Sequence, residues 1–185
     1  MSSLHDDIDR VLFTQEQLAE RVAELGRMIT ADYADRLDEP LLVMSILKGS
    51  VVFLTDLIRS IDLPLELDFV QLSSYGNATK SSGEVKVVQD INFEIRGRHV
   101  LIVEDLVDTG LTLATFSQHL ESHLPASITI ASLLKKQLDK QLPVDCRYVG
   151  FECPNEFIVG YGLDYAENYR NLPYIGVLKP QVYAT

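Results

Sequence analysis

The amino-acid sequence predicts an α/β fold in which mostly parallel strands form a central sheet flanked by helices. Three apolar runs support this prediction, at 41–47, 100–103 and 127–134. Continuous apolar runs are typical of strands that are buried on both faces of a parallel sheet. After each of the first two runs, a short polar loop leads into a helical pattern, at 51–61 and 113–124. This order of strand, loop and helix predicts parallel strands.

The composition predicts one compact domain. The chain has 185 residues and 46% hydrophobic content, enough for a core of ordinary size. Its net charge of -11 argues against a nucleic-acid partner, because affinity for nucleic acid comes mostly from clustered Lys and Arg. Cys146 and Cys153 are the only cysteines, which favours two packing residues in a reducing compartment over a disulfide.

The N-terminus is polar and acidic, unlike a signal peptide, and no run approaches the length of a membrane span. We therefore expect a cytoplasmic protein without a membrane partner.

The remaining elements are predicted from local patterns. Residues 1–13 are expected to form a short strand or arm. Thr14 with Gln17 resembles a capping box, and apolar residues then recur at helical spacing, which predicts a helix from 15 to 37. A strand at 65–73 precedes a segment, 75–83, that lacks large aliphatic side chains. This segment is expected to be a hairpin excursion or a mobile lid.

Chemistry is expected first in the stretch VLIVEDLVDTGLT, from Val100 to Thr112. Ligands of open parallel sheets bind at the carboxyl ends of strands, where this polar loop is predicted to lie. Residues Thr109, Gly110 and Thr112 enter a helix, whose free amides and dipole favour a phosphate.

The acids of this stretch suit a sugar. Glu104 and Asp105 provide acceptors for two neighbouring hydroxyls and can help to hold a hydrated magnesium ion. A ribose 5-phosphate would satisfy both the acids and the phosphate-binding amides. Asp108 lies between the two ends of such a ligand, near the anomeric carbon, so it is the candidate general acid/base.

The turn at Lys48 and Gly49, which follows the first apolar run, is a second anion-binding candidate. Backbone amides and an ammonium group in such a compact turn can hold a phosphate. Its alternative interpretation is an ordinary turn with a solvated lysine.

The stretch from Val100 to Thr112 resembles the phosphoribosyl pyrophosphate motif of the type I phosphoribosyltransferases: an apolar strand, two acids and then D-T-G-x-T. The resemblance implies phosphoribosyl pyrophosphate binding by Glu104, Asp105, Asp108, Thr109, Gly110, Leu111 and Thr112. Leu111 departs from relatives that carry Lys at this position, so a modest change in phosphate affinity is expected.

The same resemblance gives roles to two further segments. It implies that Lys48 and Gly49 bind pyrophosphate, with a cis peptide between Leu47 and Lys48, and that Ser74 and Tyr75 close as a flexible lid. The sequence S-L-L-x-K matches the purine subfamily and selects Lys136, whose ammonium would donate to the purine O6. Such a donor favours 6-oxopurines over adenine.

The last third of the chain resembles the hypoxanthine-guanine phosphoribosyltransferases, in the pattern F-I-V-G-Y-G-L-D-Y-x-E-x-Y-R-N-L. Phe157 offers a ring for purine stacking, and Ile158 and Asp164 offer backbone groups to the base. Asp164 would ligate magnesium that carries pyrophosphate, and Arg170 would contact the same anion. Taken singly, these residues also fit a core position, a turn cap or a surface charge.

The resemblance implies a type I phosphoribosyltransferase fold, with a core at about 38–150 and 172–180 and a small hood at about 1–14 and 151–171. It also implies Mg²⁺ as cofactor, with Glu104, Asp105 and Asp164 as its ligands, and a homodimer or homotetramer. The expected reaction joins hypoxanthine or guanine to phosphoribosyl pyrophosphate and releases pyrophosphate.

Two alternatives stay open at this point. One is a regulatory protein that keeps the phosphoribosyl site as a sensor and binds nucleic acid, which the acidic balance disfavours. The other is a transferase that prefers xanthine or adenine, and Lys136 argues only against adenine. A nicotinamide-dependent dehydrogenase is disfavoured because no G-x-G-x-x-G follows a strand.

Overall fold

The structure, a computed structural model, describes residues 3–74, 85–89, 91–138 and 144–184. The strands are β1 (Ile8–Phe13), β2 (Leu41–Ile46), β3 (Leu65–Ser74), β4 (Val85–Gln89), β5 (His99–Val107), β6 (Ser127–Lys136), β7 (Tyr148–Cys153), β8 (Ile158–Val159) and β9 (Ile175–Leu178). The helices are the 3-10 helix η1 (Leu4–Asp7) and the α-helices α1 (Gln15–Tyr33), α2 (Val51–Ile58), α3 (Leu111–Glu121) and α4 (Pro180–Tyr183).

The larger sheet has the strand order β4-β3-β2-β5-β6-β7. Strands β3, β2, β5, β6 and β7 pair in parallel, and β4 pairs antiparallel with β3 as the edge strand. All residues of β2 are buried, as a continuous apolar run requires. The predicted α/β fold with a mostly parallel sheet is confirmed.

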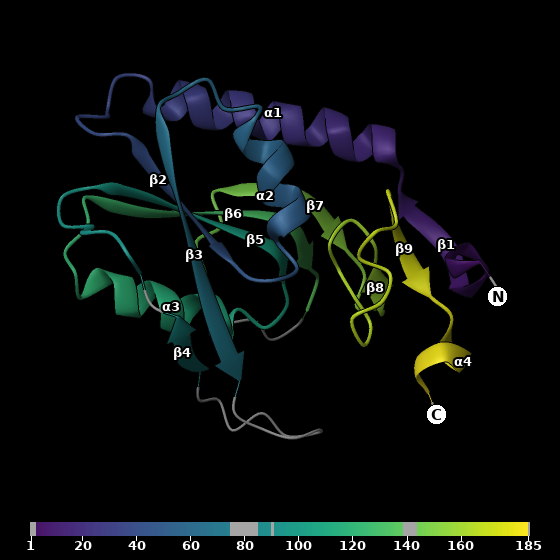
Figure 1. Ribbon diagram of the computed structural model, residues 1–185. Helices are drawn as coiled ribbons and strands as arrows, with labels where there is room; N and C mark the ends of the chain where they lie inside the picture. The colour runs from purple at the N-terminus through teal and green to yellow at the C-terminus, as the bar shows by residue number, and fades with distance from the viewer. Residues whose placement is uncertain (1–2, 75–84, 90, 139–143, 185) are drawn as a thin grey trace.

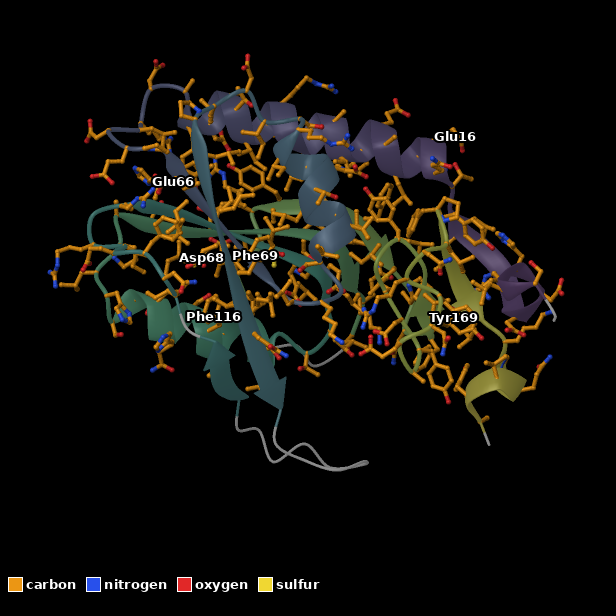
Figure 2. The ribbon with its side chains drawn as sticks, viewed as in Figure 1. Glu16, Glu66, Asp68, Phe69, Phe116 and Tyr169 are labelled. Carbon is orange, nitrogen blue, oxygen red and sulfur yellow. The ribbon has the colours of Figure 1, made fainter. Side chains whose placement is uncertain are left out.

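Helices cover both faces of this sheet, with α1 and α2 on one side and α3 on the other (Figure 1). Alternating residues of the strands point to opposite faces of the sheet and pack in two different hydrophobic clusters. Val43 and Leu101 pack in the cluster with α1 and α2, whereas Met44 and Ile102 pack in the cluster with α3. Phe116, labelled in Figure 2, is the largest buried side chain that α3 contributes to the second cluster.

A small sheet of β1, β9 and β8 lies beside the larger one, and both chain termini are on this side (Figure 1). The predicted ranges differ here. The segment 172–180, assigned to the core, contains β9, which pairs with β1 and β8. Residues 151–153, assigned to the hood, belong to β7. Tyr169 (Figure 2) donates to Asp7 Oδ2 at 2.8 Å. This bond ties the loop between β8 and β9, residues 160–174 and called the hood loop below, to the N-terminus.

The bounds of three helices differ from the sequence prediction. Helix α1 ends at Tyr33 instead of 37, and α2 at Ile58 instead of 61. In each case a tighter turn follows, with Arg36 N bonded to Tyr33 O and Ser60 N to Leu57 O, so the helical pattern outlasts the helix. Helix α3 runs from Leu111 to Glu121 instead of 113–124.

The segment 75–84, and with it most of the predicted lid, lies outside the described residues, but β3 and β4 form the predicted hairpin around it. Among the helices that the structure describes, none has the length and apolar character needed to cross a membrane.

Candidate active site

Three strands of the larger sheet end side by side at the candidate site. The turn at Lys48 follows β2, the acidic stretch closes β5, and Lys136 closes β6. Because β5 and β6 pair through Val107 and Lys135, the next residues along the two strands, Asp108 and Lys136, are neighbours at this edge of the sheet.

The acids Glu104 and Asp105 lie within β5, and not in a loop after it as the sequence predicted. The apolar run stops at Val103, but parallel pairing with β6 continues to Val107. Glu104 Oε2 is buried and, among the described atoms, accepts no hydrogen bond. An oxygen of this kind is suited to a ligand hydroxyl or a cation.

Burial dominates the ionisation of both acids. It raises the pKa of Glu104 well above its usual range, and the neighbouring Asp105 carboxylate adds to this effect. Burial also raises the pKa of Asp105, although hydrogen bonds to its carboxylate, such as that from Leu106 N at 2.8 Å, and the positive charge of Arg170 act in the opposite direction.

The loop after β5 has the geometry of an anion site. Gly110 has a φ of 81° and is the N-cap of α3. Since α3 begins two residues earlier than predicted, Leu111 and Thr112 lie in its first turn, where backbone amides have no partner within the helix and can bind an anion. Leu111 N makes one long contact, at 3.5 Å, with Thr109 Oγ1. A hollow of about 80 Å³ lies here, lined by Glu104, Leu106, Val107, Asp108, Thr109, Gly110, Leu111, Thr112 and Leu113.

Lys136 reaches the acid that the sequence singled out for proton transfer. Its Nζ lies 3.3 Å from Asp108 Oδ2. The Lys136 side chain is 14% exposed and that of Asp108 is 53% exposed. The carboxylate of the pair is therefore the more accessible group to solvent. A ligand that contacts both groups would have to carry an acceptor and a donor on neighbouring atoms.

The turn after β2 packs against the acids of β5 without a side chain between them. The Leu47–Lys48 peptide is cis, as the resemblance implied. A Cβ on Gly49 would lie 1.7 Å from Asp105 Oδ2, and a Cβ on Gly162 would lie 2.2 Å from Gly49 O. Because Gly49 and Gly162 have no side chains, β5, the turn at Lys48 and the hood loop can pack in direct contact.

Arg170 and Asp164, predicted to bind pyrophosphate and its metal, lie on this hood loop and are paired with each other. Arg170 Nη2 lies 2.9 Å from Asp164 Oδ1, and Arg170 Nη1 donates to Gly162 O at 2.8 Å. The loop also brings in Glu167, which the sequence prediction missed. Glu167 Oε1 accepts from Lys48 Nζ at 3.0 Å. Glu167 is the E of the pattern F-I-V-G-Y-G-L-D-Y-x-E-x-Y-R-N-L, so the resemblance could have pointed to this residue.

Phe157, predicted to stack on a purine, is 37% exposed and directly precedes β8. Tyr183 of α4 stacks on it, with ring centroids 4.8 Å apart, and Tyr165 meets it edge-on at 5.3 Å. Sequence reasoning missed both tyrosines. Ile158 is buried in β8, where its backbone pairs with β9.

The predicted lid pair is only partly described. Ser74 is the last residue of β3, and Tyr75 lies outside the described residues.

The predicted magnesium ligands do not form one cluster: within the described ranges, no group of three or more His, Cys, Asp or Glu side chains is arranged around a common point. Mg²⁺ usually takes one or two carboxylates together with waters and substrate phosphates. Glu104 and Asp105 fit that requirement, since Glu104 Oε2 is buried and accepts no hydrogen bond from the part of the chain that the structure describes.

Known proteins resemble this chain in sequence and in fold. The model of the phosphoribosyl transferase domain matches residues 14–166. The hypoxanthine-guanine phosphoribosyltransferase of Mycobacterium avium is 50% identical over 180 residues, covering 96% of this chain and 89% of that protein. The enzyme of the same name from Bacillus subtilis is 48% identical, with coverage of 96% and 97%.

A longer relative is the bifunctional protein TilS/HprT of Listeria innocua, which is 50% identical over 182 residues. The chain spans 28% of the length of that protein. A solved structure of hypoxanthine phosphoribosyltransferase from Staphylococcus aureus superimposes with a TM-score of 0.93 at 44% identity, covering 100% of this chain and 98% of that one. The family match, the identities and the shared fold agree, and the chain belongs to the phosphoribosyltransferase family, with the type I fold.

Proposed function

We propose that this protein is a purine salvage enzyme that transfers the 5-phosphoribosyl group of phosphoribosyl pyrophosphate to hypoxanthine or guanine. The products would be IMP or GMP and pyrophosphate. The observation that supports this best is the contact between Lys136 and Asp108, 3.3 Å apart. O6 and N7 are neighbours on the edge of a 6-oxopurine, so an ammonium and a carboxylate side by side match that edge.

In the proposed reaction, purine N9 attacks C1′ of the ribose as the bond from C1′ to the pyrophosphate oxygen breaks. The pyrophosphate leaves with the electron pair, and the ribose passes through an oxocarbenium-like transition state. The purine N7–H becomes acidic as N9 forms its bond, and the Asp108 carboxylate accepts that proton. General acid/base catalysis of this kind contributes about 10²- to 10⁴-fold.

Other residues would hold the substrates. Glu104 and Asp105 would accept from the ribose hydroxyls, and the amides around Gly110 at the start of α3 would bind the 5-phosphate. Lys48 and Arg170 would stabilise the leaving pyrophosphate, and Phe157 would stack on the base. The ribose, the 5-phosphate, the pyrophosphate and the base would thus each contact a different group of residues.

A metal ion fits this scheme. Glu104 and Asp105 would help to hold Mg²⁺ at the ribose. Asp164 would ligate magnesium that carries the pyrophosphate, and the charge of the metal would help to neutralise the leaving group. The side chains of Glu104 and Asp105 would bind the ribose, and the Asp108 carboxylate would accept the proton.

We also propose that the whole chain is one phosphoribosyltransferase domain with a hood around the small sheet. Its two cysteines are both free, which favours a reducing compartment such as the cytoplasm. Closed symmetry as a dimer or tetramer is the expected assembly. Light scattering on the purified protein would measure the subunit number.

The test is nucleotide formation from phosphoribosyl pyrophosphate and Mg²⁺ with hypoxanthine, guanine, xanthine and adenine in parallel. Asp108→Asn is compared with Asp35→Asn, which removes the same charge just beyond α1. We expect turnover of hypoxanthine or guanine, weak use of adenine, and a loss of kcat by about 10²- to 10⁴-fold in Asp108→Asn alone. Tight binding of phosphoribosyl pyrophosphate without turnover of any base would refute the enzyme and favour a sensor.

A further inference from the structure

Glu167 lies between the two cations that are proposed to bind pyrophosphate. Its Oε1 accepts from Lys48 Nζ at 3.0 Å, and its Oε2 lies 3.2 Å from Arg170 Nη2. Lys48 and Glu167 are 119 positions apart in the chain, so the tertiary fold creates this contact. A single carboxylate thus contacts, with its two oxygens, both of the cations that are proposed to bind pyrophosphate. Arg170 Nη2 also lies 2.9 Å from Asp164 Oδ1.

The hood loop places this carboxylate through its backbone. Ala166 and Glu167 have φ values of 50° and 64°, and Glu167 N donates to Asp164 Oδ2 at 2.9 Å. The same loop contacts the Lys48 turn closely, since Gly162 has no room for a side chain beside Gly49 O. Glu167 is therefore held opposite Lys48 by the conformation of the loop as well as by charge.

We propose that Glu167 is an internal counter-ion that occupies the anion position between Lys48 and Arg170 and is displaced when the pyrophosphate group binds. This inference rests on the proposed function, because it takes Lys48 and Arg170 as pyrophosphate ligands. It adds a residue that competes with the ligand. By returning to the two cations, Glu167 would also favour release of the pyrophosphate product.

The energetics fit a displaceable group. The side chains of Lys48 and Glu167 are 60% and 64% exposed, and ion pairs exposed to this extent are weak. Pyrophosphate carries several charges, so it can replace one carboxylate at both cations. Competition of this strength should weaken pyrophosphate binding by about 3- to 10-fold and not abolish it.

The experiment titrates inorganic pyrophosphate with Mg²⁺ into the full chain by calorimetry. Glu167→Gln should bind it about 3- to 10-fold more tightly than the wild type, because the competing carboxylate is gone. Glu167→Asp keeps the charge, but its shorter side chain should not span both cations, so it should also bind more tightly. Glu156→Gln is the matched control, since it removes a partly exposed hood carboxylate that pairs with Arg10 instead.

Several results would overturn the proposal. Weaker or unchanged binding by Glu167→Gln would mean that Glu167 supports the cations or has no role. If Glu167→Asp equals the wild type, or Glu156→Gln matches Glu167→Gln, net charge and not the contact sets the affinity. Nucleotide formation by the wild type separates this failure from that of the proposed function: an active wild type with unaffected variants refutes only the counter-ion.

Discussion

Gly49 has no space for a side chain, and this gives a prediction for the site. A methyl group there would lie 1.7 Å from Asp105 Oδ2, so either the Lys48 turn or the Asp105 carboxylate must move. Misplacement of binding groups by about 1 Å can cost about 10²-fold in rate. We expect Gly49→Ala to lower kcat/KM for phosphoribosyl pyrophosphate by about that factor, measured by steady-state kinetics.

Gly97→Ala is the control for this substitution. Gly97 has a φ of 74°, but a Cβ there would meet nothing within 4 Å. Its replacement should cost about 1 kcal/mol of stability through backbone strain and leave kcat/KM unchanged. Equal kinetics for Gly49→Ala and the wild type would show that the turn tolerates a side chain beside Asp105.

Lys136 is expected to set the choice of base. Lys136→Met removes the ammonium and would leave the purine O6 without a donor, which costs about 1–3 kcal/mol. We expect the ratio of kcat/KM for hypoxanthine to that for adenine to fall by about 10- to 100-fold. The ratio is the informative measurement because any effect on Asp108 is common to both bases. An unchanged ratio would assign base selection to another group.

At the scale of single residues, the sequence indicated which side chains lie at the carboxyl edge of the sheet but not how they contact one another. Asp108 and Lys136 were each singled out, and their ion pair follows from the pairing of β5 with β6. Glu167 and Tyr183 were missed because their partners, Lys48 and Phe157, are distant in sequence. Local patterns contain no information on such contacts.

Among the helices, α1 offers a clear test of stability. Thr14 Oγ1 accepts from Gln17 N at 3.3 Å, and Gln17 Oε1 accepts from Thr14 N at 2.9 Å, which completes a capping box. Thr14→Ala should lower the free energy of unfolding by about 1 kcal/mol in urea denaturation, whereas Thr14→Ser should retain most of it. The same loss in both variants would assign the effect to packing of the threonine methyl group.

Element types were easier to predict than their ends. The apolar runs at β2, β5 and β6 identified buried strands because each is continuous in sequence. The end of β5 was misplaced because Glu104 and Asp105 look like a loop, whereas pairing with β6 keeps them extended to Val107. Acids within a strand that faces a ligand are not distinguishable from loop acids by hydrophobicity alone.

For the whole molecule, the arrangement of the hood could not be predicted in detail. Strand β9 is as apolar as a strand of the larger sheet, and its four residues are all buried. It pairs with β1 and β8 instead, although the sequence prediction assigned it to the core. Strand patterns specify burial but not the pairing partner, and the N-terminal and C-terminal segments meet only in the folded chain.

The contact between α1 and β7 should make the stability of the whole fold depend on pH. Hydrogen bonds from Arg147, at 2.9 Å, and from Tyr148, at 2.7 Å, hold the pKa of Asp32 below its ordinary value. A carboxylate with a lowered folded pKa stabilises the protein above its unfolded pKa of about 3.9, and this stabilisation is lost as the pH falls through the folded value.

Since the pair of Asp32 and Arg147 is partly exposed, Asp32→Asn should lower the free energy of unfolding by about 1 kcal/mol or less at pH 7, and the difference from the wild type should shrink toward pH 3. Urea denaturation across this range measures it, with Asp35→Asn as the control of equal charge. A difference that stays constant down to pH 3 would show that packing, and not the ionised carboxylate, carries the effect.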